Sequence, residues 1–258
     1  MRRAKAMRKW LLWTVGILLA PAPAMASEGA YSFFMALPGG KQYYYIYSAL
    51  FVAALLAVIS FLVVGRKKPD EMVIPEPRLT LRNFFELILG FLMEIGEDIL
   101  GHHAKKYMPL LGTCFVFILF MNLMGLIPGL LPPTQKMNIT VGLAVVIFMS
   151  THIFGVMENG LPYFKHFLGP VWWLAPIMLP IEIISHLARP LSLSLRLMGN
   201  ITGDHAVVGG FMALAFVGWA VPSVFMGLGV FVSFMQAFIF TVLSMIYISG
   251  AVAHAEEH

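Results

Sequence analysis

Arg196 is the residue whose surroundings point most directly to a chemical role. It lies in the run Leu193-Ser194-Leu195-Arg196-Leu197-Met198, several turns from either end of a predicted helix. An arginine at the middle of a bilayer costs from about 2.5 to more than 10 kcal/mol, so it normally faces protein or water and marks an ion or substrate path. The alternative is a structural arginine, salt-bridged or with a long side chain that reaches the membrane surface. Arg189, beside Pro190, fits that alternative better.

Ser192, Arg196 and Asn200 lie at positions i, i+4 and i+8 of the same predicted helix, so they share one face. Gly199 and Gly203 fall nearby, which makes this face small or polar along its length. Small residues let a neighbouring helix approach closely. For the two glycines, plain packing between helices explains the sequence as well as a functional role does.

A similar face is predicted for the last long helix, where Gly229, Ser233 and Gln236 follow one another at helical spacing. If the two helices pair antiparallel about a turn near residue 216, Gln236 lies level with Arg196. Gln236 then has two interpretations. It is either a hydrogen-bonding residue between helices or a group that holds the guanidinium of Arg196 without neutralising it.

Further protonatable or hydrogen-bonding side chains occur in the same part of the sequence: Glu182, Ser185, His186, Asp204 and His205. Chains of Asp, Glu and His inside a membrane are the usual parts of proton relays. The alternatives are a capping or interfacial role for His186 and a locally neutralised pair for Asp204 and His205. The pattern as a whole favours a path for protons.

No metal or cofactor site is predicted. The adjacent residues His102 and His103 and the C-terminal segment 254–258 show no metal-binding spacing, and no HExxH motif occurs. The single cysteine, Cys114, excludes an intramolecular disulfide and a cysteine-based metal site. The sequence therefore indicates ion movement and gives no sign of redox chemistry.

The composition shows what environment these polar residues occupy. Of the 258 residues, 59% are hydrophobic and 12% are charged, whereas soluble domains carry about 25% charged residues. The mean hydropathy is +0.83. So few charges can cover the molecule only where lipid replaces water over most of its surface. The chain is therefore a membrane protein and not an ordinary soluble domain.

Positive charge is concentrated at the N-terminus, where Arg2, Arg3, Lys5, Arg8 and Lys9 are five of the 17 Lys and Arg residues. An apolar stretch follows, and then the small-residue triplet Ala24-Met25-Ala26. This order is typical of a signal peptide, so we expect residues 1–26 to be a signal-like segment that is cleaved. The alternative is an uncleaved anchor, although the apolar stretch is short for a span of about 20 residues. Because the excess positive charge belongs to this segment, nucleic acid is not an expected partner.

Residues 27–68 are expected to form an external N-terminus and a first span at 43–64. The span ends at Arg66-Lys67-Lys68, a basic cluster that marks the cytoplasmic side. Residues 69–107 are expected to form a cytoplasmic, proline-interrupted linker and an amphipathic helix at 81–106 that lies along the membrane surface. The apolar residues of this helix recur at helical spacing: Phe84, Leu87, Ile88, Phe91, Leu92, Ile95 and Ile99.

Residues 108–258 carry few charges and are expected to form a membrane-embedded domain. The predicted elements are spans at 108–131 and 138–157, an external turn at 132–136, a loop at 158–166, an apolar segment at 171–188, and long helices at 190–217 and 222–253. Each long helix exceeds a bilayer core of about 30 Å, so strong tilt is expected. The predicted fold is an all-α membrane protein with about five to six membrane-embedded helices, which include a strongly tilted C-terminal pair, and an interfacial amphipathic helix.

Segment 189–200, Arg-Pro-Leu-Ser-Leu-Ser-Leu-Arg-Leu-Met-Gly-Asn, closely resembles the signature of subunit a of the F-type ATP synthase membrane sector. Other segments resemble the same family in the same order: 122–129, 138–140, 236–240, Tyr247 and 256–258. Together they extend over most of residues 80–258. Such an ordered set of matches is highly specific.

The resemblance implies a stator that holds a rotating ring of c subunits, with two aqueous half-channels that meet near an essential arginine, here Arg196. It implies a subunit that is not catalytic on its own and has no cofactor. The implied partners are the c ring, b-type peripheral-stalk subunits, the F1 sector through the complex, and the lipid bilayer. The implied location is the bacterial cell inner membrane, crossed several times, with an external N-terminus and a cytoplasmic C-terminus.

For individual residues, the resemblance and the polar pattern together give a proton path of Arg196, Glu182, Asn200, Asp204, His205, Gln236, His186 and Ser192. The residues expected to face the c ring are Ser192, Arg196, Gly199, Asn200 and Gly203. The chain departs from many bacterial members, which have a glutamate at the position of His205 and a histidine at the position of Gly229. Asp204 is the candidate for the missing carboxylate.

Three other classes of protein compete with this interpretation. A secondary transporter for an anionic solute would use Arg196 to bind substrate, but no inverted pair of interrupted helices supports it. An intramembrane hydrolase lacks a nucleophile motif such as GxSxG. A purely structural role does not explain why the charged residues Arg196 and Glu182 occur in a membrane helix. Co-purification with a c ring and a soluble ATPase discriminates the stator from the transporter.

Overall fold

The computed structural model describes residues 32–64, 80–127, 129–160, 163, 175–212 and 220–252. The long helices are α2 (Gly40–Val64), α3 (Leu81–Leu100), α4 (Ala104–Met124), α5 (Met137–Asn159), α7 (Ala175–Met212) and α8 (Ala220–Val252). Short 3-10 turns occur at η1 (Phe33–Ala36), η3 (Gly101–His103) and η4 (Pro133–Gln135). No described residue belongs to a strand, and the all-α prediction is confirmed.

Four stretches of described helix are long and apolar enough to cross a bilayer: Gln42–Val63, Leu81–Met124, Met137–Asn159 and Met226–Val252. The second stretch joins α3 and α4 across η3. These stretches agree with the predicted class of multi-pass membrane protein. The predicted signal-like segment 1–26, the linker 69–77 and the C-terminal residues 254–258 lie outside the described residues.

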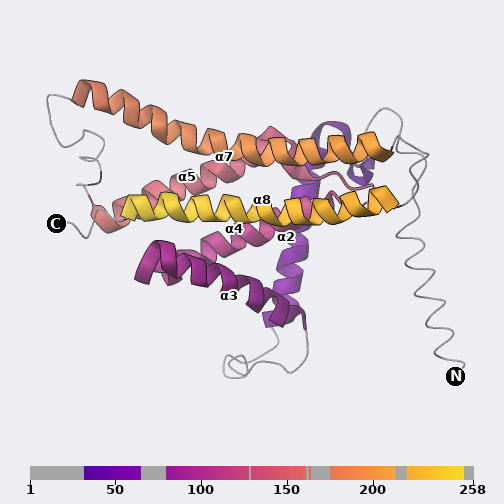
Figure 1. Ribbon diagram of the computed structural model, residues 1–258, viewed down its shortest axis with the longest axis horizontal. Helices are drawn as coiled ribbons and strands as arrows, with labels where there is room; N and C mark the ends of the chain where they lie inside the picture. The colour runs from indigo at the N-terminus through magenta and orange to yellow at the C-terminus, as the bar shows by residue number, and fades with distance from the viewer. Residues whose placement is uncertain are drawn as a thin grey trace, which may run out of the picture.

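The two C-terminal helices are the longest elements. Figure 1 shows α7 and α8 running along the longest dimension of the molecule, with α2 crossing their direction. At 1.5 Å per residue, the 38 residues of α7 extend about 57 Å and the 33 residues of α8 about 50 Å. Both lengths exceed a hydrocarbon core of about 30 Å. The two helices therefore fit within a bilayer only when they are strongly tilted.

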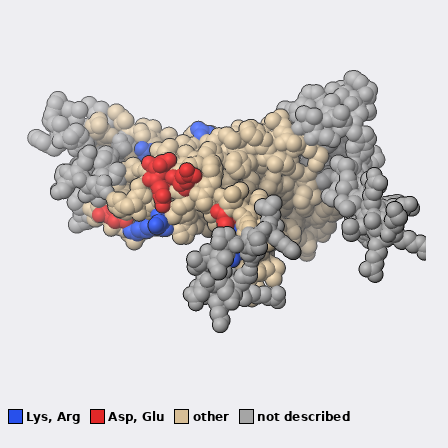
Figure 2. Space-filling model, turned by 60° about the horizontal axis from the view of Figure 1, so that its bottom comes forward, with Lys and Arg blue, Asp and Glu red and all other residues tan. Residues whose placement is uncertain are grey.

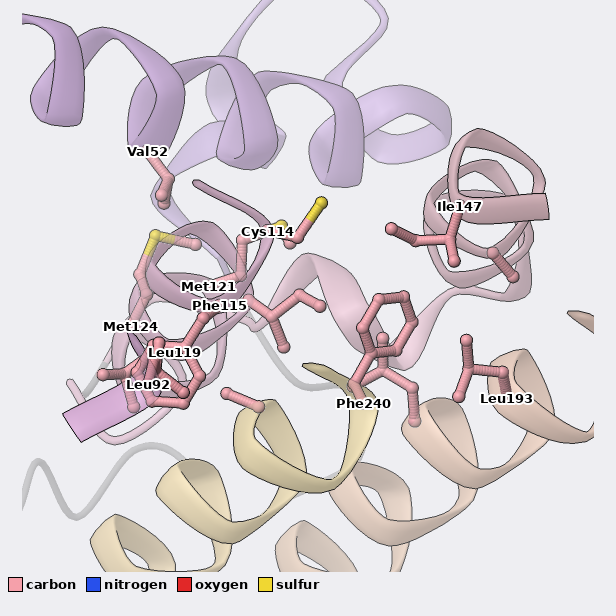
Figure 3. Close-up of a cluster of buried hydrophobic side chains, with 14 residues drawn as sticks. Val52, Leu92, Cys114, Phe115, Leu119, Met121, Met124, Ile147, Leu193 and Phe240 are labelled. Atoms are coloured by element: carbon pink, nitrogen blue, oxygen red, sulfur yellow. The ribbon is translucent and has the colours of Figure 1, made fainter. Parts of the chain in front are cut away.

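The main apolar core lies where six helices meet. Figure 3 shows side chains from α2, α3, α4, α5, α7 and α8 in one cluster, among them Val52, Leu92, Phe115, Leu193 and Phe240. Each of these five side chains is at most 2% exposed. Because lipid tails are as apolar as these residues, close van der Waals packing is what favours helix association here. This packing holds α7, the helix of Arg196, in a fixed position against α5 and α8.

Polar contacts tie one end of the bundle together. Lys106 of α4 forms an ion pair with Glu158 of α5, and the Tyr107 hydroxyl donates to the same carboxylate at 2.8 Å. The Asn159 side chain donates to the Ala251 carbonyl of α8 at 2.8 Å. These contacts connect residues far apart in the sequence, so they fix the relative positions of α4, α5 and α8.

A second set of contacts ties the opposite end. The Thr134 hydroxyl of η4 donates to the buried Asn122 side chain at 2.8 Å, and Asn122 donates to the Ser233 carbonyl of α8 at 3.5 Å. The Phe33 backbone N–H donates to the Gly129 carbonyl at 3.0 Å. The span predicted at 108–131 therefore ends too late, because α4 stops at Met124 and the following residues turn back onto the bundle.

The predicted break at Pro190 is wrong. The segment 171–188 and the helix 190–217 were expected to be separate, but α7 continues through Pro180 and Pro190 as one helix. Pro190 has no N–H for the carbonyl one turn earlier. A membrane helix tolerates this loss when neighbouring helices surround it, and α5 and α8 pack against α7. The residues predicted for the proton path on both sides of Pro190 therefore belong to one helix.

The amphipathic character predicted for α3 is confirmed, but its apolar residues divide between two surroundings. Leu92 is fully buried in the bundle, whereas Phe84, Leu87 and Phe91 are exposed on the outside. The exposed face also carries charge in the C-terminal half of the helix. Figure 2 shows acidic and basic side chains gathered on one part of an otherwise uncharged surface, and the exposed acidic residues of this half of α3 are Glu94, Glu97 and Asp98.

Candidate functional site

Two faces of α7 differ in burial and in polarity. One face is buried and consists of His186, Leu193, Ser194, Leu197 and Ile201. Another face is exposed and consists of Ser192, Arg196, Gly199, Asn200 and Gly203. With 3.6 residues per turn the two sets centre on different sides of the helix, and Asn200, seven residues after Leu193, lies at the border between them. The second set, which we call the polar face of α7, contains all the residues that the sequence analysis placed together.

Arg196 extends from this polar face. Among the residues that the structure describes, none forms a hydrogen bond or an ion pair with its guanidinium. A Cβ atom added at Gly199 or Gly203 would meet no atom within 4 Å. The two glycines therefore do not serve packing against any of the residues that the structure describes. They leave open space beside a positive charge, on the outside of the bundle.

Gln236 lies next to this face but is itself buried. The Asn200 side chain donates a 2.6 Å hydrogen bond to the Gln236 side-chain oxygen. Gln236 and Ser233 are each 2% exposed, and Gly229 is buried as well. The small or polar face predicted for α8 therefore points into the protein. The contact of Gln236 is with Asn200, one helical turn from Arg196.

A second polar group occurs where α5, α7 and α8 meet. The rings of His152 and His186 are 5.4 Å apart in an edge-to-face arrangement, and His186 is 9% exposed. Arg189 lies over the ring of Tyr247, 5.4 Å from its centroid. These four residues and Thr151 line a cavity of about 10 Å³, which is room for roughly one water molecule.

The tautomer of His152 follows from its hydrogen bond. Its Nδ1 donates to the Phe148 carbonyl at 2.9 Å, and a carbonyl oxygen can only accept. The proton of the neutral ring is therefore on Nδ1, which leaves Nε2 as the acceptor. A histidine fixed in this way can take up a proton at Nε2 and pass it on.

Tyr163 lies beside this histidine pair. Its ring is 6.1 Å from that of His152, and the residue is 5% exposed. Burial raises the pKa of the Tyr163 hydroxyl, and the positive charge of Arg189 acts in the opposite direction. The hydroxyl is therefore neutral at physiological pH, so Tyr163 contributes no charge to the cavity region.

Several predicted site residues are placed only by their position along α7. Glu182, Asp204 and His205 belong to this helix, but their side chains lie outside the described residues. Glu182 precedes Arg196 on the helix, and Asp204 and His205 follow it. Ser185 lies about one helical turn after Glu182, and its side chain is exposed. In the described part of the chain, no three His, Cys, Asp or Glu residues are close enough to hold a metal ion.

The sequence analysis did not include His152 among the candidate residues. It lies inside the third predicted span, 138–157, and a histidine in a membrane span is by itself a signal for function. Its proximity to His186 could not be read from the sequence, because the two residues are on different helices. Tyr247 was noted only through the resemblance, with no partner assigned to it.

A family model described as ATP synthase A chain matches residues 46–249. The chain belongs to the ATP synthase subunit a family. An ATP synthase subunit a of Geobacter sulfurreducens is 50% identical over 175 residues, which are 68% of this chain and 76% of that protein. ATP synthase subunit a 3 of Pelobacter propionicus is 45% identical over 204 residues, 79% of this chain and 85% of that protein. ATP synthase subunit a of Bdellovibrio bacteriovorus is 46% identical over 188 residues, 72% and 81% of the two chains.

Membership of this subunit a family confirms the resemblance seen in the sequence. The chain is a multi-pass membrane subunit of the Fo sector, and it translocates protons without being catalytic on its own. All residues of the polar face of α7 lie inside the matched range 46–249. His152 and Tyr247 lie inside it as well.

Proposed function

We propose that Arg196 couples proton flow to rotation of the c ring, and that two proton half-channels meet near this residue. The observation that carries the proposal is the polar face of α7. Arg196 is exposed there without a described partner, and the glycines beside it leave open space. A buried structural arginine would need a counter-charge, and none of the described residues supplies one.

The coupling step follows from the charge of Arg196. A carboxyl group of the ring that approaches this guanidinium loses its proton, because a nearby positive charge favours the ionised form of an acid. The carboxylate can pass the arginine, whereas a free proton is repelled and does not leak from one half-channel to the other. A potential of about 100 mV supplies about 2.3 kcal/mol per proton, which biases the direction of rotation.

The two half-channels are proposed to use polar residues on opposite sides of Arg196 along α7. One contains Glu182, His186 and, as an addition from the fold, His152 beside His186. The other contains Asn200 with Gln236, to which it is hydrogen-bonded, and Asp204 and His205 further along the helix. Because α7 is one continuous helix, the order of these groups along it is the order along the path.

The surroundings of the subunit are proposed from the same arrangement. The c ring would lie against the polar face of α7, while b-type peripheral-stalk subunits hold the chain and connect it to the F1 sector. The location is proposed to be a bacterial cell inner membrane, because the relatives named above come from bacteria. The basic cluster at 66–68 follows α2 directly in the sequence, which puts the C-terminal end of α2 on the cytoplasmic side and the N-terminus outside.

The test is ATP-driven proton pumping in inverted membrane vesicles that carry Arg196→Ala or the control Arg189→Ala. We expect Arg196→Ala to lower pumping by at least about tenfold, because the charge that acts on the ring is gone. We expect Arg189→Ala to keep most of the activity, since the contact of this half-buried side chain with the Tyr247 ring contributes only about 0.5–2 kcal/mol.

Assembly is measured in parallel by co-purification of the c ring and the soluble ATPase. Loss of pumping in a fully assembled Arg196→Ala complex supports the proposed coupling. Pumping that survives the substitution contradicts it. If Arg196→Ala instead abolishes uptake of an anionic solute by a complex that still pumps, a secondary transporter becomes the better account.

A further inference from the structure

A large apolar groove lies between α2, α3 and α4. Its volume is about 730 Å³, and its walls include Ala53 and Ala57 of α2, Leu89 of α3, and Gly112 and Phe117 of α4. None of its lining residues belongs to the polar face of α7 or to the histidine pair. The groove is therefore separate from the proposed proton path.

The groove exists because α2 packs closely against α4 at one level only. Figure 3 shows Val52 of α2 pointing toward Met121 and Met124 of α4, and Val52 is 2% exposed. Beyond this contact, toward the C-terminal end of α2, Ala53, Ala57 and Ser60 present small side chains to the groove. The described residues leave the space between the two helices unfilled.

The groove is elongated along two helices. From Ala53 to Val63 it follows α2 for about 15 Å, and from Lys105 to Phe117 it follows α4 for about 18 Å. A groove of this length can hold an acyl chain that extends through one leaflet, which is half of a hydrocarbon core about 30 Å thick.

A positive charge lies at one end of this groove. Lys105 lines the groove and is exposed, and no described residue pairs with its ammonium group. The neighbouring Lys106, by contrast, is paired with Glu158. Val63, near the C-terminal end of α2, lines the groove as well.

Pro109 adds an acceptor at the same end. It lines the groove within α4 and has no N–H for the carbonyl of Lys105, four residues earlier. The nearby Thr113 hydroxyl donates to the Pro109 carbonyl at 2.6 Å and is therefore already used. Beside Lys105 the groove thus has a polar backbone group, while most of its lining is apolar.

The acidic side chains of α3 do not cancel this charge. Glu94, Glu97 and Asp98 are exposed on the outer face of α3. Phe85 and Leu89, which line the groove, lie on a different side of the same helix. The charge nearest to the groove is therefore positive.

We propose that this groove binds an anionic glycerophospholipid, with an acyl chain in the apolar part and the phosphate group at Lys105. Basic pockets between membrane helices on the cytoplasmic side bind anionic lipid head groups. The volume lies within the range of about 300–1,000 Å³ that is usual for small-molecule sites. The assignment to the cytoplasmic leaflet rests on the orientation proposed above, and the lipid site itself does not.

The experiment measures lipid retained by the assembled complex in detergent. The complex is incubated with dioleoylphosphatidylglycerol or dioleoylphosphatidylcholine, separated from free lipid by gel filtration, and the bound lipid is quantified by mass spectrometry. Lys105→Gln removes the charge, and Lys136→Gln removes an exposed lysine elsewhere as the matched control. Ala57→Trp fills the groove, and Val58→Trp adds the same side chain at an exposed position of α2 outside it.

We expect the wild-type complex to prefer phosphatidylglycerol, with about a fivefold loss of preference in Lys105→Gln, as one lysine near an anionic head group predicts. Ala57→Trp is expected to lose the retained lipid, and both controls to keep it. Unchanged retention in Lys105→Gln and Ala57→Trp overturns the proposal. Release of another membrane subunit by Ala57→Trp, with lipid retention unaltered, also overturns it and makes the groove an interface for a helix.

Two features of this experiment allow its result to be interpreted by itself. Lys105→Gln changes an exposed side chain, so it remains informative even if the tryptophan in the groove prevents assembly. The measurement uses no ATP and no proton gradient. A failure of the proposed role of Arg196 therefore leaves the lipid result unaffected, and a failure of the lipid site leaves the pumping result unaffected.

Discussion

At the level of single residues, the arrangement around Arg196 keeps its charge available. Asn200 could have served as a hydrogen-bonding partner for the guanidinium, but its amide donates to Gln236. Hydrogen bonds between membrane helices contribute on average only about 0.6 kcal/mol. The Asn200–Gln236 bond therefore does little for stability, and its main consequence is that both side chains are oriented toward each other beside an unpaired positive charge.

Gly199 gives the prediction that belongs to this scale. The Cβ of a leucine at this position meets no atom of the described residues within 4 Å, so the subunit is expected to fold and insert normally. If the polar face of α7 lies against the c ring, the larger side chain blocks the close approach that glycine permits. We expect Gly199→Leu to lower ATP-driven pumping by at least about tenfold, with normal amounts of the subunit in the membrane by immunoblot.

Gly142 provides the matched control for this substitution. It is an exposed helical glycine of α5 whose added Cβ would likewise meet nothing within 4 Å. Gly142→Leu should therefore leave pumping close to the wild-type value. Equal losses in the two variants would mean that any bulky residue is harmful, and the polar face of α7 would no longer be distinguished as the ring contact.

At the level of elements, the molecule depends on short segments that return to the bundle between helices. Gly129, between α4 and η4, is one of them. Its φ of 87° is in the left-handed region, and its carbonyl accepts from the Phe33 N–H of η1. A Cβ at Gly129 would lie 2.3 Å from the Phe33 ring. Both the backbone conformation and the space therefore require glycine.

The prediction at this scale is that Gly129→Ala loosens η1. A non-glycine residue in the left-handed region costs about 1–2 kcal/mol, and the contact with the Phe33 ring adds to this cost. We expect faster hydrogen–deuterium exchange at residues 33–36 and a lower thermal stability of the purified complex. The hydrogen bond from the Phe33 N–H to the carbonyl of residue 129 should be lost first, because η1 is short and is held by few hydrogen bonds.

Gly142→Ala is the comparison for this variant as well, since the position is helical and open. Alanine is favoured over glycine in a helix by about 1 kcal/mol, so this variant should be as stable as the wild type or slightly more stable. If Gly129→Ala exchanges no faster than Gly142→Ala at residues 33–36, the packing of η1 on Gly129 is not what holds this end of the chain.

For the whole molecule, the main feature is that α2 crosses the direction of α7 and α8 (Figure 1). Helices that span a bilayer in the ordinary way lie within about 40° of its normal. If α2 crosses the membrane in that way, α7 and α8 must lie much closer to the membrane plane. A helix pair in this orientation presents a long side to a neighbour in the membrane, which suits contact with a ring that moves past it.

The prediction for this scale concerns depth in the membrane. Nitroxide labels are placed in a Cys114→Ala background at Leu50 and Phe61 of α2, or at Ile184 and Leu195 of α7, all of which are exposed. Each pair is separated by about 16 Å along its helix. Power saturation with oxygen and a water-soluble nickel chelate measures the depth of each label in a reconstituted bilayer.

We expect the two α2 labels to differ in depth by most of that distance, and the two α7 labels to differ by less than half of it. The α2 pair is the internal control, because it reports whether the method resolves depth in this protein. Equal depth differences for the two pairs would contradict the strong tilt of α7 and with it the proposed geometry of contact with the ring.

The sequence was sufficient for the class of protein, and it singles out Arg196 as the leading candidate residue. Membrane insertion follows from composition, and the special position of Arg196 follows from the cost of a charge among apolar neighbours. The ordered motifs were sufficient for the family, which the comparisons confirmed. Element types were correct as well, because long apolar stretches in a membrane have little alternative to helix. The break expected at Pro190 was wrong, because the rule used for it describes helices without neighbours.

Only the tertiary structure decided which surfaces are open and which residues meet. Helical spacing places Ser192, Arg196 and Asn200 on one face, but it does not say whether another helix covers that face. The meeting of His152 with His186, the hydrogen bond of Gln236 to Asn200, and the groove between α2 and α4 all join segments that are far apart in the chain. Such contacts depend on how several helices pack at once, and local spacing carries no information about that packing.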